Sequence, residues 1–500
     1  MRPQGSTENS NPFPGNLSIL LDSCRERTPE RNGIGTAEKM LTFAEYHDTV
    51  CRLAGGLRGL GLERNDRVLL SSLAPLGYAT LSLAVFRLGA VLVPVNPRMG
   101  PYELAHILSE TRPRLVVCNA ITIPTILKAC GLVREAPSPS LITQDEKVPA
   151  TPFVEELALS EPLLQWEKMA ADDTAMIVFT AAMEGYPLGA QLTHGSLFSD
   201  TVAFARQSFR DNDADSEILF SLLPLFHTYG FTNGFLVPLA GGVTCLLLGT
   251  SLRGRTVVDL MARYRPTQII SVPALFHGLL KPLSEKPGFL AGIRNLTSGG
   301  VGISKKLLDL YEEKLGLTIS EGYGLTEASP VVTWNGLDRP PKFGTVGPPL
   351  SCCQVKIVGD RGEEVSPGEE GEVLVKGSNL FSGYLNRPGH TQKSFVDGWF
   401  RTGDLGCLDD EDYLTITGLK KDMINVFGLK AYPREIERLI GNHPDIASAR
   451  IRREWHDRYG EIVAGDIYLK PGRTMSERSF FDWCRRHISP YKIPRDIRIH

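Results

Sequence analysis

The chain is 500 residues long, more than one hydrophobic core usually serves, so two or more domains are expected. Hydrophobic residues make up 42% of it and charged residues 22%, values typical of a globular protein rather than a disordered one. The formal net charge of −3 gives no general attraction to nucleic acid or to an anionic membrane, so neither is an expected partner.

The nine cysteines are scattered, without a CxxC pair or a ligand spacing with histidine. Such a set in a large chain is typical of reduced thiols, so we expect a cytoplasmic protein without a zinc site. The longest apolar run, residues 235–249, is too short to span a bilayer and contains two adjacent glycines. We interpret it as a buried strand with its flanks, and expect no transmembrane segment.

Helical and strand patterns alternate through the first two thirds of the chain. They predict helices at about 41–60, 76–88, 102–111, 257–264 and 305–315, and strands at about 66–72, 90–95, 115–118, 175–180, 217–223 and 268–272. This alternation predicts mostly parallel sheets covered by helices on both faces. Residues 135–152, rich in proline, serine and charge, predict a surface loop.

The pattern changes in the last third of the chain. Short alternating runs from about 344 to 414 predict a small antiparallel barrel or sheet. Beyond Gly418, helices at 433–442 and 477–487 and strands at 447–452 and 462–469 predict a further unit. The expected domains are therefore 1–417, with its barrel part at about 344–417, and 418–500.

Two segments carry a specific chemical signature. The first is EGYGLTE at 321–327, and the second is GWFRTGDLG at 398–406, which GLKKDMINVFG at 418–428 and YPREIE at 432–437 follow. Their order and spacing resemble the adenylate-forming superfamily of acyl-CoA synthetases, luciferases and peptide-synthetase adenylation domains. Further segments lie where that family has similar ones: PLFHTYG at 224–230, LTH at 192–194, TSGG at 297–300 and YKIP at 491–494. Within the family the chain most resembles the fatty-acyl and medium-chain acyl-CoA ligases.

The resemblance extends from about residue 41 to residue 494 and implies both a fold and a reaction. The implied fold is α/β: a large N-terminal domain of two parallel-type αβαβα subdomains with a small β-barrel, then a small mobile α+β domain. The implied reaction joins a carboxylic acid, most simply a fatty acid, to AMP from ATP, and then transfers the acyl group to CoA or a carrier-protein thiol. ATP, Mg²⁺ and CoA are the implied cofactors, and catalysis would consist mainly of positioning and charge neutralisation.

The resemblance also assigns the nucleotide contacts. Tyr323 would stack on the adenine, while Gly322 and Gly324 allow close backbone approach. Asp404 would accept hydrogen bonds from both ribose hydroxyls, because one carboxylate can receive two. The other implied cofactor-binding positions are Thr180, Gly185, Gly189, Gly299 and Gly300.

The resemblance assigns the catalytic residues and the hinge to other segments. Thr326 would bind phosphate, and Glu327 would hold Mg²⁺, a hard cation that prefers carboxylate and phosphate oxygens. His227 would line the acyl carboxylate site and gate the acyl tunnel. Gly418 lies where the family hinges between its two domains, and residues 428–433 would line the thiol tunnel after rotation.

The phosphate loop departs from the family pattern, which reads roughly aromatic-Thr-Ser-Gly-Thr-Thr-Gly-x-Pro-Lys-Gly. This chain has FTAAMEGYPLG at 179–189, so the frame survives in Thr180, Gly185, Pro187 and Gly189. Leu188 replaces the lysine, and Glu184 puts an anion where triphosphate oxygens should rest.

Two more cations of the family are missing. Leu419 stands where the family's Gly-Arg-x-Lys-Asp segment has its arginine. The sequence ends at His500, before the position of the lysine in the family's Thr-Gly-Lys segment. A longer gene product would supply that lysine. Loss of one preorganised donor typically costs about 2.7–4 kcal/mol in the transition state. We therefore expect impaired adenylation, with binding of adenosine or acyl-adenylate less affected.

Two hypotheses remain open. In the first, the chain is an ATP-dependent acid–thiol ligase that makes acyl-CoA through acyl-adenylate. In the second, it is a non-catalytic homologue that binds AMP, acyl-adenylate or an acyl ligand as a sensor or partner. Acid-dependent formation of AMP separates them.

Overall fold

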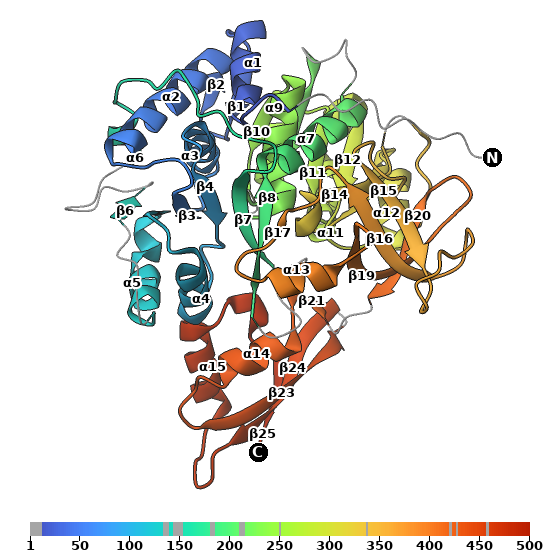
Figure 1. Cartoon of the computed structure of the whole chain (residues 1–500). Coiled ribbons are helices and arrows are strands. Elements are labelled where there is room, and N and C mark those ends of the chain that lie inside the picture. Colours follow the sequence, from blue (N-terminus) through green and yellow to red (C-terminus); the bar gives the residue numbers. More distant parts are fainter. Residues whose placement is uncertain are drawn as a thin grey trace.

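The computed structural model describes residues 13–133, 140–143, 154–180, 186–209, 216–249, 252–336, 339–419, 423–426, 429–456 and 460–500. Figure 1 shows a large lobe built by the first four fifths of the chain and a small lobe formed by the C-terminal residues. Three sheets belong to the large lobe, and the small lobe contains a three-stranded sheet and a hairpin.

The first sheet has seven strands in the order β17-β8-β7-β4-β3-β5-β6. Its strands are β3 (Arg67–Ser71), β4 (Val91–Pro94), β5 (Leu115–Cys118), β6 (Ser140–Thr143), β7 (Thr174–Thr180), β8 (Leu188–Thr193) and β17 (Gly383–Tyr384). Strands β3 to β7 run parallel, whereas β8 is antiparallel to β7 and to β17. The apolar strands β4 and β5 are buried along their whole length, as expected for parallel strands covered on both faces. The helices of this region are α2 (Phe43–Gly59), α3 (Pro75–Arg87), α4 (Pro101–Thr111), α5 (Ile123–Gly131) and the short α6 (Val154–Leu157).

The second sheet has eight strands in the order β14-β13-β12-β11-β9-β10-β1-β2. Its strands are β1 (Asn32–Gly35), β2 (Met40–Thr42), β9 (Ile218–Ser221), β10 (Thr244–Leu247), β11 (Gln268–Ser271), β12 (Asn295–Ser298), β13 (Ile319–Gly324) and β14 (Val331–Trp334). Only its two edges, β2 and β14, pair antiparallel. The accompanying helices are α1 (Ile19–Arg27), α7 (His194–Ser208), α8 (Thr228–Phe231), α9 (Val237–Gly241), α10 (Gly254–Tyr264), α11 (Pro273–Glu285) and α12 (Lys305–Leu315).

The third sheet is antiparallel and follows the two parallel ones. It contains β15 (Cys353–Val358), β16 (Gly371–Gly377), β18 (Phe395–Val396), β19 (Trp399–Leu408) and β20 (Leu414–Leu419), with α13 (Pro388–Ser394) before β18. Gly418 lies inside β20, where its backbone pairs with Leu405. The predicted domain boundary at this glycine stays a prediction.

The small lobe has a core of its own. It consists of the hairpin β21 (Ile424–Val426) and β22 (Leu429–Ala431), the strands β23 (Ile446–His456), β24 (Gly460–Leu469) and β25 (Asp496–Ile499), and the helices α14 (Pro433–Ile440) and α15 (Glu477–His487). Helix α14 turns Ile436, Leu439 and Ile440 inward, at the spacing of one helix face. Ile424 of the hairpin joins the same cluster, so the hairpin is anchored in this lobe.

The expected α/β architecture is confirmed, and two local predictions are wrong. The run 235–249 is helical through α9 to Gly241, and only β10 at its end is a strand. This helical stretch is buried nearly all round, so it has no polar face to reveal its period. The expected loop 135–152 contains β6, which pairs parallel with β5, while 135–139 and 144–152 lie outside the described residues. No helix in the described part of the chain is long and apolar enough to cross a membrane.

A buried ionic cluster joins the two lobes. Lys492 of the small lobe lies between Glu103, on α4 of the large lobe, and Glu435, on α14, with 2.6 Å from its Nζ to the nearest oxygen of each. None of the three side chains is more than 3% exposed. Ser489 strengthens the link, because both its backbone N–H and its hydroxyl donate to Glu103.

The surroundings of Glu103 and Glu435 stabilise the ionised carboxylate to different extents. Burial opposes ionisation of Glu103, but the charge of Lys492 and the hydrogen bonds from Lys492 and Ser489 outweigh it and lower its pKa. Burial raises the pKa of Glu435, and the charge of Glu103 adds to this effect against that of Lys492. Moreover, Oε2 of Glu435 has no hydrogen-bond partner among the residues that the structure describes. The ionised form is therefore favoured at Glu103 and disfavoured at Glu435.

This assignment predicts unequal effects of two similar substitutions. Glu103→Gln removes the charged partner of a buried lysine and should lower the free energy of unfolding by about 3–5 kcal/mol. Glu435→Gln replaces the carboxyl whose ionised form is disfavoured and should cost less than about 1 kcal/mol. Urea unfolding of the two full-length variants measures the difference, and equal losses would contradict the assignment.

A pH series provides the control. Folding lowers the pKa of Glu103, so its contribution is present above the unfolded value, about 4.3, and is lost as the pH falls below that value. The acid-induced loss of stability should therefore be smaller in Glu103→Gln than in the native chain.

Candidate functional site

A cavity of about 420 Å³ lies where the large and small lobes meet. Its volume falls within the range of small-molecule sites. Most of its wall comes from the second and third sheets of the large lobe, and the small lobe contributes Met423, Leu429, Lys430, Tyr432 and Tyr491. Ten of the predicted site residues lie in this wall: Thr180, His227, Gly299, Gly300, Gly322, Tyr323, Gly324, Thr326, Glu327 and Asp404.

A tyrosine–aspartate pair joins the second and third sheets in this wall. The hydroxyl of Tyr323, on β13, donates to Oδ2 of Asp404, on β19, at 2.5 Å. Asp404 is 8% exposed, and its backbone N–H donates to the hydroxyl of Thr402. Burial, followed by the nearby charge of Asp404, raises the pKa of Tyr323 well above its usual value, so the phenol keeps its proton and remains the donor. The two residues predicted to contact adenine and ribose are thus direct neighbours.

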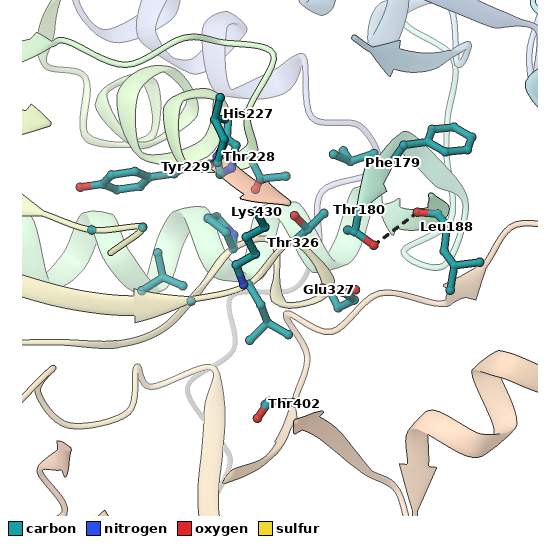
Figure 2. Close-up of a pocket in the computed structure, with 18 of the residues that line it drawn as sticks. Phe179, Thr180, Leu188, His227, Thr228, Tyr229, Thr326, Glu327, Thr402 and Lys430 are labelled. Atoms are coloured by element: carbon teal, nitrogen blue, oxygen red, sulfur yellow. Dashed lines mark hydrogen bonds between the residues drawn. The ribbon is translucent and has the colours of Figure 1, made fainter. Parts of the chain in front are cut away.

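Glu327 lies in a short turn of helix directly after β13. The hydroxyl of Tyr384, on β17 of the first sheet, donates to Oε1 of Glu327 at 2.8 Å, and the backbone N–H of Phe381 donates to its carbonyl. Figure 2 shows Thr180, Thr326 and Glu327 on one side of the cavity. The segment of Glu327 is therefore held by β17 and faces β8 and β7.

His227 lies at the start of α8 and is exposed to the cavity. Its Nδ1 accepts the backbone N–H of Tyr229 at 3.3 Å. Burial by the surrounding walls, followed by the charge of Lys430, lowers its pKa to about 4. At neutral pH the ring is therefore uncharged, and because Nδ1 is the acceptor, Nε2 carries the proton. His227 can donate one hydrogen bond to a ligand but is a poor proton acceptor.

Two glycines of the site are closely approached by other parts of the chain. A Cβ on Gly324 would lie 2.1 Å from the carbonyl oxygen of Pro330, and a Cβ on Gly299 would lie 3.1 Å from the ring of Tyr229. Both positions thus allow close packing of the wall itself. Any additional contact of these glycines with a nucleotide stays a prediction.

The phosphate-loop segment is described only at its two ends. The hydroxyl of Thr180 donates to the carbonyl of Leu188 at 3.5 Å, which closes the β7–β8 pair, and both residues line the cavity (Figure 2). Gly185 and Glu184 lie outside the described residues. Gly189 is not part of the cavity wall, since the space beside it is filled by Ile177, Phe179 and Leu385.

The small lobe contacts the end of this segment. The guanidinium carbon of Arg438, on α14, lies 3.9 Å from the ring centroid of Tyr186. The other side of the segment is held by His106 of α4, whose Nε2 is 2.9 Å from the carbonyl of Pro187. Stacking of this kind is worth about 0.5–2 kcal/mol, so it contributes to the contact between the lobes.

Several functional groups of the site were not singled out from the sequence. Tyr384 is distant in sequence from Glu327, and its SGY context carries no chemical signature. Asn233 follows His227 on a π-helical turn inside an apolar run. Lys430 belongs to the segment 428–433 that the resemblance assigns to the thiol tunnel, which was the one available signal.

Metal ligands are sparse in the described residues. No group of three or more His, Cys, Asp or Glu side chains there is arranged to hold a metal ion. Glu327 offers a single carboxylate beside the predicted phosphate site. This arrangement fits Mg²⁺, which proteins commonly bind through one or two carboxylates together with substrate phosphates.

Known proteins resemble the chain over nearly all its length. Feruloyl-CoA synthase from Amycolatopsis sp is 30% identical over 474 residues, 94% of this chain and 91% of that protein. A long-chain-fatty-acid–CoA ligase from Salmonella typhimurium is 27% identical over 507 residues, covering 96% and 90% of the two chains.

Solved structures match equally well. An o-succinylbenzoate CoA synthetase double mutant from Bacillus subtilis, bound with its product analogue, is 26% identical, with a TM-score of 0.83 over 96% of this chain and 94% of that chain. The same synthetase in complex with AMP gives a TM-score of 0.69 over the same shares, at 25% identity.

Two family models account for most of the sequence. The model of the AMP-binding enzyme matches residues 21–385, and the model of the AMP-binding enzyme C-terminal domain matches residues 435–500. The chain therefore belongs to the AMP-binding enzyme family, and its relatives named here are acid–CoA ligases.

Proposed function

We propose that the chain is an AMP-forming acid–CoA ligase, which activates a carboxylic acid with ATP and transfers the acyl group to CoA. The observation that carries the proposal is the convergence of Tyr323, Asp404, Glu327 and His227 on one cavity shared by both lobes. The named relatives, which act on feruloyl and long-chain fatty acyl groups, support the same reaction class.

Each group has a distinct role in this proposal. Asp404 receives the ribose hydroxyls, and Tyr323 packs against the base while holding Asp404 in place. Thr326 donates to phosphate, and Glu327 holds Mg²⁺ together with the phosphate oxygens. The Nε2–H of His227 faces the acid or acyl carbonyl. Positioning and charge neutralisation would supply most of the rate enhancement.

The phosphate-loop sequence affects the expected rates of adenylation and of thioester formation. Leu188 lines the cavity where the family has a lysine, so the described wall near the triphosphate lacks a cation at that position. We expect adenylation to be slower than thioester formation. A second candidate function, binding of AMP or acyl-adenylate without turnover, rests on the same observation.

One assay separates the two candidates. The full-length protein is incubated with ATP, Mg²⁺, CoA and a panel of fatty and aromatic acids, and AMP release is measured. Acid-dependent AMP supports the ligase. Binding of AMP by calorimetry without AMP release from any acid supports the second candidate, and absence of both contradicts each of them.

The first substitution tests the ribose site. Asp404→Asn keeps the shape but loses the charged acceptor, so the affinity for AMP should fall about 10-fold to 100-fold. Asp409→Asn is the matched control, because Asp409 lies outside the cavity wall and pairs with Lys342. Equal affinities of the two variants for AMP, measured by calorimetry, would contradict the assignment.

The second substitution tests the missing cation. Leu188→Lys should raise acid-dependent ATP–pyrophosphate exchange by about 10-fold or more, since one preorganised donor is worth about 2.7–4 kcal/mol in favourable cases. Leu188→Met controls for the change of shape. An unchanged exchange rate in Leu188→Lys would show that charge at this position does not limit adenylation.

The acyl side of the cavity suggests the class of acid. Phe204 and Trp334 form an aromatic wall, with ring centroids 4.5 Å apart. Asn233 lines the same cavity and is fully buried, and neither its Oδ1 nor its Nδ2 has a hydrogen-bond partner among the described residues. The hydroxyl of Ser298, which also lines the cavity, has no hydrogen-bond partner in the part of the chain that the structure describes. Because unpaired buried polar groups are costly, an acid that supplies a hydroxyl would gain binding energy here.

We therefore expect a preference for hydroxylated aromatic acids over saturated fatty acids of similar size. Asn233→Leu should lower kcat/KM for a hydroxylated cinnamic acid by about 10-fold and leave that for unsubstituted cinnamic acid within about threefold. Equal effects on both acids would indicate a structural role for Asn233 instead.

A further inference from the structure

Three lysine or arginine side chains line the described part of the cavity wall: Arg387, Arg401 and Lys430. Arg387 is neutralised by Glu110, at 2.8 Å. Arg401 forms a bidentate pair with Glu372, whose oxygens lie 3.2 and 2.5 Å from Nε and Nη2. Lys430 has no ion pair with any residue that the structure describes. It is therefore the cation of this wall that remains available to a ligand.

The backbone of Lys430 is held firmly while its side chain stays exposed. It lies on β22, between Leu429, which lines the cavity, and Ala431, which is buried in the core of the small lobe. Pairing of β22 with β21 fixes its direction. Figure 2 shows Lys430 extending between the segment of His227 and Thr228 and the segment of Thr326 and Glu327. Its ammonium thus faces the space between the predicted carboxylate and phosphate contacts.

The acidic groups across the cavity have other partners. Tyr323 donates to Asp404, and Tyr384 donates to Glu327. Neither carboxylate lies within ion-pair distance of Lys430. An anionic ligand between these segments would consequently meet one free positive charge, and that charge belongs to the small lobe.

We propose that Lys430 binds the α-phosphate of acyl-adenylate in the present lobe arrangement and supplies the positive charge that the phosphate loop lacks at Leu188. This inference rests on the proposed ligase function. It assigns Lys430 to thioester formation, because β22 belongs to the small lobe and places Lys430 in the same cavity wall as His227, at the predicted acyl carboxylate site.

The chemistry requires such a charge. The CoA thiol loses its proton to solvent, and its sulfur attacks the acyl carbon as the carbonyl electron pair moves to oxygen. The intermediate then collapses: the carbonyl re-forms, the bond between the acyl carbon and the phosphate oxygen breaks, and AMP leaves with that electron pair. The ammonium of Lys430 stays protonated and neutralises the charge that grows on the phosphate.

A comparison of AMP with adenosine tests the contact without turnover. In Lys430→Met, the affinity for AMP should fall about 10-fold, the usual size of one hydrogen bond to a charged group, while that for adenosine stays within about twofold. Lys430→Arg should retain most of the affinity for AMP. Lys376→Met, a lysine outside the cavity wall, should match the native chain in both titrations.

Two failures are distinguishable in this experiment. If the native chain binds neither AMP nor adenosine, both the proposed ligase function and the inference about Lys430 are overturned. If it binds both, and Lys430→Met keeps the full preference for AMP, only the inference about Lys430 is overturned.

A rate measurement tests the assignment to one half-reaction. Preformed cinnamoyl-adenylate and dodecanoyl-adenylate are mixed with saturating CoA and excess protein, and single-turnover release of AMP is followed. Lys430→Met should slow this step about 10-fold to 100-fold and leave ATP–pyrophosphate exchange within about twofold. A parallel loss in both assays, or no loss from either adenylate, would overturn the assignment.

Discussion

The buried pair between Lys492 and Glu103 is the constraint on which the site depends. It crosses from the small lobe to α4 of the large lobe, and it has little exposure to water. Breaking such a pair leaves an uncompensated buried charge, so the relative position of the lobes is strongly specified. In this position Tyr432 and Lys430 complete the cavity wall. The site is thus a product of an interface as much as of either lobe.

The charged side chains of the cavity are also held by specific partners. Phenolic hydroxyls hold the two carboxylates in place without cancelling their charge, because Tyr323 and Tyr384 are neutral donors. Carboxylates outside the cavity wall neutralise the two arginines. The cavity therefore presents oriented acceptors for hydroxyls and metal and one available cation.

Much of the fold and part of the site could be predicted from sequence, for physical reasons. The alternation of helical and strand periodicities predicted the parallel sheets. The short motifs around Tyr323 and Asp404 predicted the residues of the nucleotide site. The helix before Gly242 was missed because a segment buried all round has no period to detect. Tyr384 and Glu103 were missed because their partners are distant in sequence, and only folding brings them together.

The location of Lys430 on the small lobe also has a thermodynamic consequence. If Lys430 contacts AMP in only one arrangement of the lobes, the affinity for AMP differs between arrangements. Thermodynamic linkage makes this effect reciprocal. Bound AMP must then favour that arrangement by the same factor by which the arrangement favours AMP. Departure of the product and reopening of the lobes would accordingly be a single coupled equilibrium, with accumulated AMP acting as a brake on the next cycle.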